Sequence, residues 1–292
     1  MTTSMNAPVP AAAPLLALPG GESVPRLGLG TWRMGEARAS RKQEAAVLRH
    51  AIAAGIRLID TAEMYGEGGA EEVVGESLRG AGVAREELFI VSKVYPWNGS
   101  RGATRAACER SLKRLATGTI DLYLLHWRGD HPLADTVSAF EELKREGKIR
   151  HWGVSNFDSA DMRELVALAE GRNCAVNQVY YNLARRWPEA SLLPWQREHG
   201  IAAMAYSPLD QGKLLKHPSL APIAARHGVT AAQVALAWLL RAGDVIVIPK
   251  TSSIERVGEI LGARQVKLDS DDLAALEKAF PPPQAGARME TN

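Results

Sequence analysis

Short apolar runs recur along the chain, each rich in β-branched, aromatic or leucine residues and bounded by turn-forming residues. Runs of this kind are typical of β-strands. We interpret eight of them as strands, over residues 26–32, 56–60, 87–94, 120–127, 149–157, 175–181, 201–209 and 244–251. Segments between them place apolar residues three and four positions apart and end on glycine, which predicts amphipathic helices. The clearest helices cover residues 41–55, 69–82, 104–118, 133–147 and 159–171.

The alternation of strand and helix predicts parallel strands joined by crossover helices. Eight such units fit an α/β fold of the (β/α)8 TIM-barrel type, which usually has about 250 residues. An open doubly wound sheet is the rival, but residues 28–33 (GLGTWR) hold only the first two glycines of a dinucleotide fingerprint, and no helix start follows. We expect one (β/α)8 domain over 15–280, with tails at 1–14 and 281–292. The segment 17–27 is predicted to form an N-terminal β-hairpin plug at the bottom of the barrel.

Composition excludes several classes of protein. Lys plus Arg (35) nearly balance Asp plus Glu (33), and this small excess does not favour nucleic acid or an acidic membrane surface. The longest apolar run, 231–240, is too short to span a bilayer. Cys108 and Cys174 have no CxxC spacing, and the N-terminus has no signal-peptide pattern. We therefore expect a cytoplasmic protein without a metal site, monomeric or weakly oligomeric, that acts on a small molecule.

Polar side chains gather at the predicted carboxyl ends of the strands, where barrel enzymes carry their active sites. In chain order these positions are Thr31, Trp32, Asp60, Lys93, His126, Ser155, Asn156, Gln178, Tyr206, Ser207, Lys250 and Thr251. Each residue alone has an ordinary structural interpretation, such as a loop cap or a solvated charge. Their convergence on one rim favours a functional site.

Three of these polar groups, together with a nearby tyrosine, suggest a proton donor. A tyrosine hydroxyl has an ordinary pKa of about 10 and needs a nearby cation to act as an acid. Lys93 would supply that cation to Tyr65, five residues beyond Asp60, and Asp60 would hold the ammonium in place. His126 would direct a carbonyl oxygen toward the tyrosine. The set predicts aldehyde reduction.

Motifs along nearly the whole chain resemble the aldo-keto reductases. LIDTAEMYGEGGAEEVVGESL is similar to the family's Asp and Tyr signature, IVSKV to its lysine strand and DLYLLHW to its histidine strand. WGVSNF and VNQVYYN resemble its nicotinamide-amide segments, and AYSPL and VIPKTSSIERVGE its cofactor-clamping segments. Within the family, several motifs most resemble a bacterial branch that includes methylglyoxal reductases.

The resemblance implies a (β/α)8 fold, NADPH as hydride donor, and a catalytic tetrad of Asp60, Tyr65, Lys93 and His126. It places Ser155, Asn156 and Gln178 at the carboxamide and Tyr206 on the nicotinamide ring. It places Ser207 and Leu209 at the pyrophosphate. It places Lys250, Thr251 and Arg256 at the adenosine 2′-phosphate and Glu259 near the adenine. Ser252, Thr31, Trp32 and Asp60 complete the expected cofactor contacts. Ile260 stands where the family commonly has asparagine.

Three tryptophans that follow strand ends predict a small aromatic pocket. Trp32, Trp97 and Trp127 would form it with Tyr65 and His126, although packing above the barrel is an alternative interpretation of the tryptophans. Trp152, Trp187, Trp195 and Trp238 are expected to be structural. Only residues 281–292 follow the last predicted helix, so no long lid is expected to enclose a large substrate. Small aldehydes and 2-oxoaldehydes should be preferred, with His126, Asn98 or Arg128 as a donor to the second carbonyl.

Two alternatives remain open from the sequence. One is a non-catalytic subunit on the same fold that senses the redox state of its cofactor, because such a protein can keep the tetrad. The other is a phosphate-handling barrel enzyme with Lys93 as a Schiff-base lysine. Two features count against the barrel enzyme of the second alternative. The sequence has no glycine-rich phosphate loop near strands seven and eight, and Asp60 would keep Lys93 protonated and poorly nucleophilic.

Overall fold

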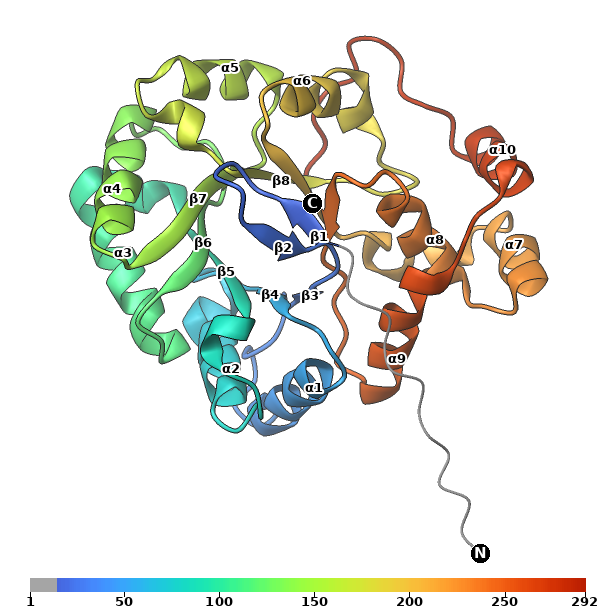
Figure 1. Ribbon diagram of the computed structural model, residues 1–292, viewed down its shortest axis with the longest axis horizontal. Helices are drawn as coiled ribbons and strands as arrows, with labels where there is room; N and C mark the ends of the chain where they lie inside the picture. Colours follow the sequence, from blue (N-terminus) through green and yellow to red (C-terminus); the bar gives the residue numbers. More distant parts are fainter. Residues whose placement is uncertain (1–14) are drawn as a thin grey trace, which may run out of the picture.

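The computed structural model describes residues 15–292 and contains an eight-stranded sheet whose neighbouring strands are all parallel (Figure 1). The order is β10-β9-β8-β7-β6-β5-β4-β3, which follows the chain without reversal. The strands are β3 (Leu29–Gly30), β4 (Leu58–Asp60), β5 (Phe89–Val94), β6 (Ile120–Leu125), β7 (Ile149–Ser155), β8 (Val176–Tyr180), β9 (Ala202–Tyr206) and β10 (Val245–Val247). All eight lie inside predicted strand segments. The tail predicted for residues 1–14 lies outside the described residues.

Contacts between the first and last strand segments close the sheet into a barrel. Parallel bridges join Leu27 to Val247 and Gly30 to Lys250, and Gly28 N donates to Val247 O at 2.9 Å. Position 28 favours glycine, because a Cβ there would lie 2.8 Å from the backbone oxygen of Leu58 and 2.3 Å from a carbon of its side chain. The GLG sequence therefore serves close strand packing, and the predicted (β/α)8 fold is confirmed.

Helices surround the barrel (Figure 1). They are α1 (Arg41–Ala53), α2 (Gly69–Leu78), α3 (Arg101–Leu115), α4 (Leu133–Arg145), α5 (Ser159–Ala167), α6 (Leu192–Glu198), α7 (Leu220–His227), α8 (Ala231–Leu240), α9 (Ile254–Gly262) and α10 (Ser270–Ala279). The connection from β9 to β10 holds two helices, and Thr230 caps the second by accepting from Gln233 N. Within residues 15–292 no single helix is long and apolar enough to cross a membrane, although α7 and α8 together pass that test as a pair bent by 91°.

The predicted hairpin plug is present. Strands β1 (Leu15–Ala17) and β2 (Ser23–Pro25) pair antiparallel. Leu18 and Val24 are buried in one apolar cluster with residues of the barrel strands, among them Leu58, Phe89 and Val91. The hairpin thus fills the barrel interior from the end where the strands begin.

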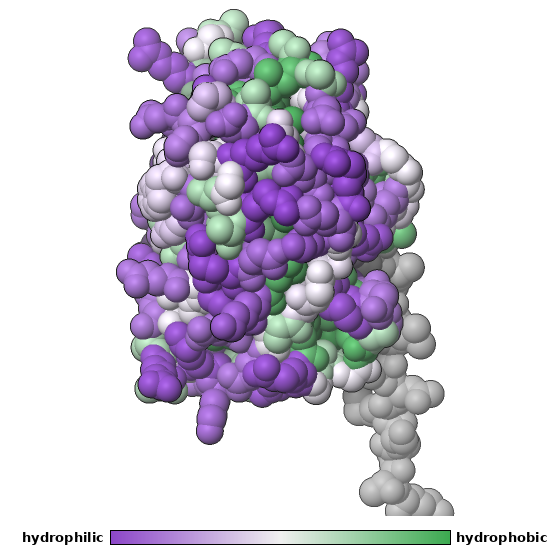
Figure 2. Space-filling view, turned by 90° about the vertical axis from the view of Figure 1, so that its left-hand side faces the viewer, coloured by the Kyte–Doolittle hydropathy of each residue, from purple (hydrophilic) through white to green (hydrophobic). Residues whose placement is uncertain are grey.

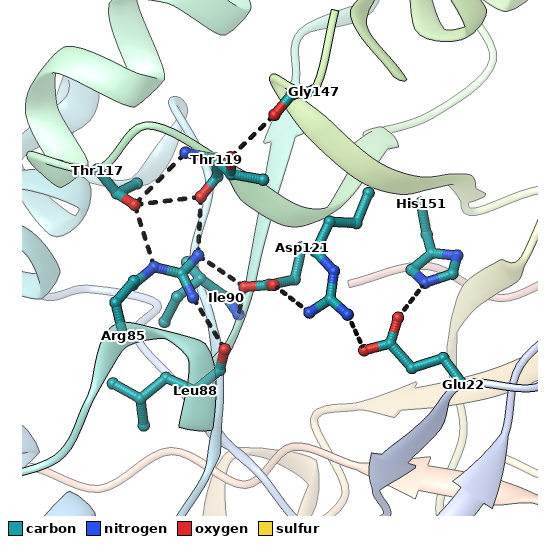
Figure 3. A network of polar contacts seen from close by, with 10 residues as sticks. Glu22, Arg85, Leu88, Ile90, Thr117, Thr119, Asp121, Gly147 and His151 are labelled. Atoms are coloured by element: carbon teal, nitrogen blue, oxygen red, sulfur yellow. Dashed lines mark hydrogen bonds and ion pairs between the residues drawn. The ribbon is translucent and has the colours of Figure 1, made fainter. Parts of the chain in front are cut away.

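A polar network ties this hairpin to the starts of the strands (Figure 3). Glu22 pairs with Arg150 and, at 2.6 Å, with His151, both near the start of β7. Asp121, at the start of β6, accepts from Arg150 at 2.9 Å and from Arg85 at 2.7 Å. The network joins four separate chain segments at the bottom of the barrel, opposite the predicted site.

The outer surface is mostly polar on the side where α3 and α4 lie (Figure 2). These helices carry ion pairs across their contact, including Arg105 with Glu142 at 3.2 Å and with Glu146 at 2.7 Å. Their apolar faces, including Leu115 and Phe140, are buried against the barrel. The amphipathic pattern of these helices is thus satisfied by one apolar face and one charged face.

Candidate active site

The four predicted tetrad residues converge at the carboxyl ends of β4, β5 and β6. Asp60 is the last residue of β4, Tyr65 begins the short 3-10 helix Tyr65–Gly68, and Lys93 is the fifth residue of β5. Lys93 Nζ donates to both carboxylate oxygens of Asp60 at 2.8 Å and to Thr61 O at 2.8 Å. It also lies 3.3 Å from the Tyr65 hydroxyl. Lys93 is completely buried, and these protein groups take the place of water around its ammonium.

Burial sets the protonation of this cluster. It raises the pKa of Tyr65 well above its usual 10.0, and the Asp60 carboxylate adds to the rise. The sequence-based expectation that Lys93 would favour the phenolate is therefore outweighed at rest. Burial lowers the pKa of Lys93, whereas Asp60 opposes that shift. Tyr65 thus stays a neutral hydroxyl beside a charged ammonium, which is the state that a proton donor requires.

His126 follows β6 and faces the tyrosine. The two rings meet edge to face with centroids 5.8 Å apart. Burial and the positive charge of Lys93 hold the pKa of His126 well below 6.5, so the imidazole is neutral near pH 7. Its Nδ1 atom is buried without a hydrogen-bond partner among residues 15–292, which leaves Nε2 as the nitrogen able to meet a substrate oxygen.

The residues expected at the nicotinamide form one hydrogen-bonded group beside the tetrad. Gln178 Nε2 donates to Asp60 Oδ1 at 2.8 Å, and Ser155 Oγ donates to Gln178 O at 2.9 Å. Asn156 Nδ2 donates to His126 O at 3.1 Å, and the Tyr206 hydroxyl donates to Asn156 Oδ1 at 2.9 Å. Gln178 therefore links the tetrad to this group directly, a contact that the sequence did not reveal.

One face of the Tyr206 ring is covered by Tyr180. The rings are stacked with centroids 5.4 Å apart and planes 6° apart, while Tyr206 stays partly exposed. The Tyr180 hydroxyl in turn donates to the buried Asp210. The sequence analysis missed both supporting residues, although the repeated Tyr180-Tyr181 pair was a possible signal. A ring supported from behind suits stacking against a flat ligand.

The loop after β9 is strained. Ser207, Asp210 and Gln211 all have positive φ, at 46°, 48° and 53°. Such conformations are uncommon for residues other than glycine and cluster at binding sites. The segment after α10 returns to this loop: Asn292 Nδ2 donates to Ser207 Oγ at 3.2 Å and Gln211 Nε2 donates to Asn292 Oδ1 at 2.7 Å. The short tail thus reaches the site, although no long lid was expected.

Two cations near the start of α9 fit a phosphate group. Lys250 and Arg256 are exposed and form no ion pair with any residue of 15–292. Lys250 Nζ donates to Ser252 Oγ at 2.5 Å, and Thr251 is buried beside it. Free cations and hydroxyls together match the oxygens of a phosphate monoester.

Two expected adenine-side positions point elsewhere. Glu259 accepts from the Thr230 hydroxyl, and Ile260 is buried in the core. Ile260 is therefore a packing residue of α9.

Two other residues expected to contact the cofactor differ in exposure. Leu209 is partly exposed, and Thr31 is buried, with its hydroxyl donating to Asp60 O at 3.0 Å.

Aromatic rings form a row from the tetrad to the rim. Trp127 lies 5.0 Å from His126 and 5.6 Å from Trp97 between ring centroids, and Trp97 stacks on Tyr95 at 4.1 Å. Trp97 is 61 % exposed, as expected for a pocket rim. Trp32 is partly buried, with the Arg33 guanidinium 4.4 Å from its ring. Trp152, Trp187 and Trp238 are buried, and Trp195 is packed against the core.

Both rim donors suggested for a second carbonyl already make hydrogen bonds within the protein. Asn98 Nδ2 donates to Glu63 Oε1 at 3.0 Å. The Arg128 guanidinium donates to His131 O at 3.0 Å and to Glu164 at 3.1 Å. His126 is the third predicted donor at this position.

Comparison with known proteins agrees with this geometry. The model of the Aldo/keto reductase family matches residues 26–280. Methylglyoxal reductase YeaE of Escherichia coli (strain K12) is 49 % identical over 93 % of this chain and 96 % of its own length. Glyoxal reductase of Bacillus subtilis (strain 168) is 39 % identical over 88 % of this chain and 89 % of its own.

A solved structure is also closely similar. The aldo-keto reductase from Klebsiella pneumoniae in complex with NADPH superposes with a TM-score of 0.92 at 47 % identity, covering 97 % of this chain and all of the other. The predicted cofactor agrees with the NADPH in that crystal structure. The fold, the convergent tetrad and these matches lead to one conclusion: the chain belongs to the aldo-keto reductase family of oxidoreductases.

Proposed function

We propose that this protein reduces small aldehydes and 2-oxoaldehydes to alcohols with NADPH. The observation that carries the proposal is the buried contact of Lys93 Nζ with both Asp60 oxygens and with the Tyr65 hydroxyl. The names of the two relatives, a methylglyoxal reductase and a glyoxal reductase, support the substrate class. The alternative of a non-catalytic sensor receives no support from them.

Tyr65 is the proposed general acid. NADPH, when bound, supplies the hydride for the carbonyl carbon. The Tyr65 hydroxyl gives its proton to the carbonyl oxygen, and the neighbouring Lys93 ammonium stabilises the phenolate that this transfer leaves. Asp60 keeps Lys93 charged and oriented through two hydrogen bonds. The neutral His126 donates from Nε2 to the same carbonyl oxygen and aligns it with Tyr65.

The proposed cofactor contacts follow the groups described above. Asn156, Ser155 and Gln178 would hold the carboxamide, and the supported ring of Tyr206 would stack on the nicotinamide. Ser207 and Leu209 would face the pyrophosphate, which requires the Asn292 contact with Ser207 to open. Lys250, Arg256, Thr251 and Ser252 would bind the 2′-phosphate, because the two cations have no protein carboxylate to neutralise them within residues 15–292. Glu259 remains in the proposed set for adenine through its second carboxylate oxygen, since only Oε1 accepts from the Thr230 hydroxyl.

Trp32, Trp97 and Trp127 are proposed to wall the substrate site above Tyr65 and His126. The row of rings between His126 and Trp97 supports a narrow apolar slot with one polar end. Such a slot favours a small carbonyl compound over a steroid. We further propose a cytoplasmic, monomeric or weakly oligomeric protein, consistent with two free buried thiols, Cys108 and Cys174.

A substrate panel tests the proposal. NADPH oxidation should be followed with methylglyoxal, butanal, 4-nitrobenzaldehyde and a 3-ketosteroid under identical conditions. We expect the highest kcat/KM for methylglyoxal and the lowest for the steroid. A preference for the ketosteroid, or methylglyoxal below butanal, would contradict the small-pocket assignment, and the absence of turnover with every carbonyl would contradict the reductase assignment itself.

A further inference from the structure

Glu63 is a buried carboxylate that the proposed chemistry does not use. It lies three residues beyond Asp60, just past the end of β4, and is 7 % exposed. Its Oε1 atom accepts two hydrogen bonds, from Tyr95 N at 2.9 Å and from Asn98 Nδ2 at 3.0 Å. Its other oxygen faces Arg110 and Arg114 of α3 at 3.6 and 3.9 Å. A buried carboxylate needs such partners, so its position is well defined.

Both donors belong to the connection that carries Trp97. This connection, residues 95–99, leaves β5 two residues after Lys93 and leads into α3. The two residues that donate to Glu63, Tyr95 and Asn98, lie on either side of Trp97 in the sequence. Glu63 therefore joins the segment behind the tetrad to the backbone on which the outermost rim tryptophan stands.

Packing alone does not fix Trp97, because the side chain is 61 % exposed. Polar bonds hold its backbone from the other side. Thr104 Oγ1 donates to Asn98 O at 2.8 Å, and His131 Nε2 lies 3.2 Å from Trp97 O. Thr136 Oγ1 of α4 also donates to Gly99 O at 2.6 Å. Glu63 supplies the anchor on the side of the tetrad, and without it the segment would be held only from the side of α3, α4 and the β6–α4 connection.

A series of ring contacts links Trp97 to His126. Its ring stacks on Tyr95 and meets Trp127 edge to face, and Trp127 lies against His126. A shift of the 95–99 segment therefore widens or narrows the slot at its outer end, farthest from Tyr65. Such a shift would therefore change the binding only of a substrate long enough to reach that end.

We propose that Glu63 is a positioning residue that sets the width of the aromatic slot and thereby the selectivity for 2-oxoaldehydes bearing an aryl group. The proposal deepens the proposed function and depends on Trp97 as part of the substrate wall. Methylglyoxal and phenylglyoxal present the same pair of carbonyls to Tyr65 and His126. They differ in the aryl ring, which is the part that extends toward Trp97.

Steady-state kinetics with these two dicarbonyls test the proposal. Glu63→Ala should raise KM for phenylglyoxal about tenfold while kcat, and both constants for methylglyoxal, stay within about twofold. Glu63→Gln should behave nearly as the unmodified protein, because its amide oxygen still accepts from Tyr95 N and Asn98. Glu67→Ala is the matched control, since Glu67 is an exposed acid of the adjoining 3-10 helix.

A double substitution locates the effect. Trp97→Ala should by itself raise KM for phenylglyoxal, and adding Glu63→Ala to it should change KM by less than about twofold, because the two act through one wall. Full additivity, an effect of Glu63→Ala without one of Trp97→Ala, or an equal loss of kcat for both substrates would overturn the proposal. So would a Glu63→Gln variant as impaired as Glu63→Ala, because the charge toward Arg110 and Arg114 would then be the cause.

Two further measurements keep the test decisive. If Glu63→Ala does not fold, Asn98→Ala removes one of the two bonds and should still raise KM for phenylglyoxal selectively; an unchanged KM would refute the positioning role. Amide hydrogen exchange over residues 94–99 should be faster in Glu63→Ala than in the Glu63→Gln and Glu67→Ala proteins. This readout needs no turnover, so it distinguishes a failure of the Glu63 assignment from a failure of the proposed reductase function.

Discussion

At the scale of single residues, burial rather than the neighbouring cation dominates the resting state of the acid. Tyr65 and Lys93 are in hydrogen-bond range, yet the pKa of Tyr65 is raised and that of Lys93 is lowered by burial. In the proposed reaction, Lys93 would therefore act when negative charge develops on the tyrosine oxygen. This arrangement suits a protein that donates a proton over a wide pH range and stabilises the product of that donation.

The pH profile follows from these directions. Tyr65 is competent while protonated, below a pKa raised above 10.0, and His126 is neutral above a pKa lowered beneath 6.5. The kcat/KM of reduction should therefore be nearly flat around neutral pH. At higher pH it should fall first as Lys93 loses its proton, because its pKa lies below the usual 10.5. A tenfold fall per pH unit beginning near neutrality would contradict this assignment of charges.

At the scale of elements, the hairpin and the strand starts form one electrostatic unit. Glu22 on the connection between β1 and β2 pairs with both Arg150 and His151 of β7. The side chains of Glu22 and Arg150 are 27 % and 43 % exposed, so solvent weakens the interaction. The apolar contacts of Leu18 and Val24 hold the rest of the plug.

Removing that carboxylate should loosen the plug without affecting the site. Glu22→Ala should lower the free energy of unfolding by about 1 kcal/mol, the range for partly exposed ion pairs. The loss should shrink at high salt. Glu198→Ala, at an exposed acid of α6, serves as control. Urea denaturation measures both, and an equal change in the two variants would refute a specific role for Glu22.

The elements also show how much of the fold and the site the sequence predicts. Periodicity located every barrel strand, because parallel strands buried on both faces are continuous apolar runs. It did not reveal that the Gln178 amide contacts Asp60, because that contact joins the ends of β8 and β4 across the barrel. Nor did it reveal the contact of Asn98 with Glu63, because both residues lie in the irregular connections that follow the neighbouring strands β5 and β4. The strained turn at Ser207 and Asp210 was equally hidden, because neither residue is a glycine.

At the scale of the whole molecule, the formal charge is nearly balanced, with 35 Lys plus Arg against 33 Asp plus Glu. Some basic side chains on the barrel, such as Arg105 and Arg114, are paired with carboxylates, whereas Lys250 and Arg256 form no ion pair within residues 15–292. These two cations, beside the hydroxyls of Thr251 and Ser252, are the proposed basis for preferring a phosphorylated dinucleotide.

Cofactor preference tests the role of these two cations. The kcat/KM ratio of NADPH over NADH should greatly exceed one, and Arg256→Ala should reduce it at least about tenfold through KM, as loss of a charge-assisted contact does. Arg172→Ala removes an exposed arginine from the connection between α5 and β8 and should leave the ratio unchanged. A ratio near one in the unmodified protein would refute the phosphate assignment.

The central claim is that Tyr65 gives the proton, and Tyr65→Phe tests it most directly. The substitution keeps the ring and removes only the hydroxyl that lies 3.3 Å from Lys93 Nζ. Turnover of methylglyoxal and the dissociation constant of NADPH, followed by quenching of tryptophan fluorescence, should be measured on the same preparation. We predict that kcat falls by at least about a hundredfold while the dissociation constant changes by less than about threefold. Turnover above a tenth of that of the unmodified protein, with NADPH still bound normally, would contradict the account.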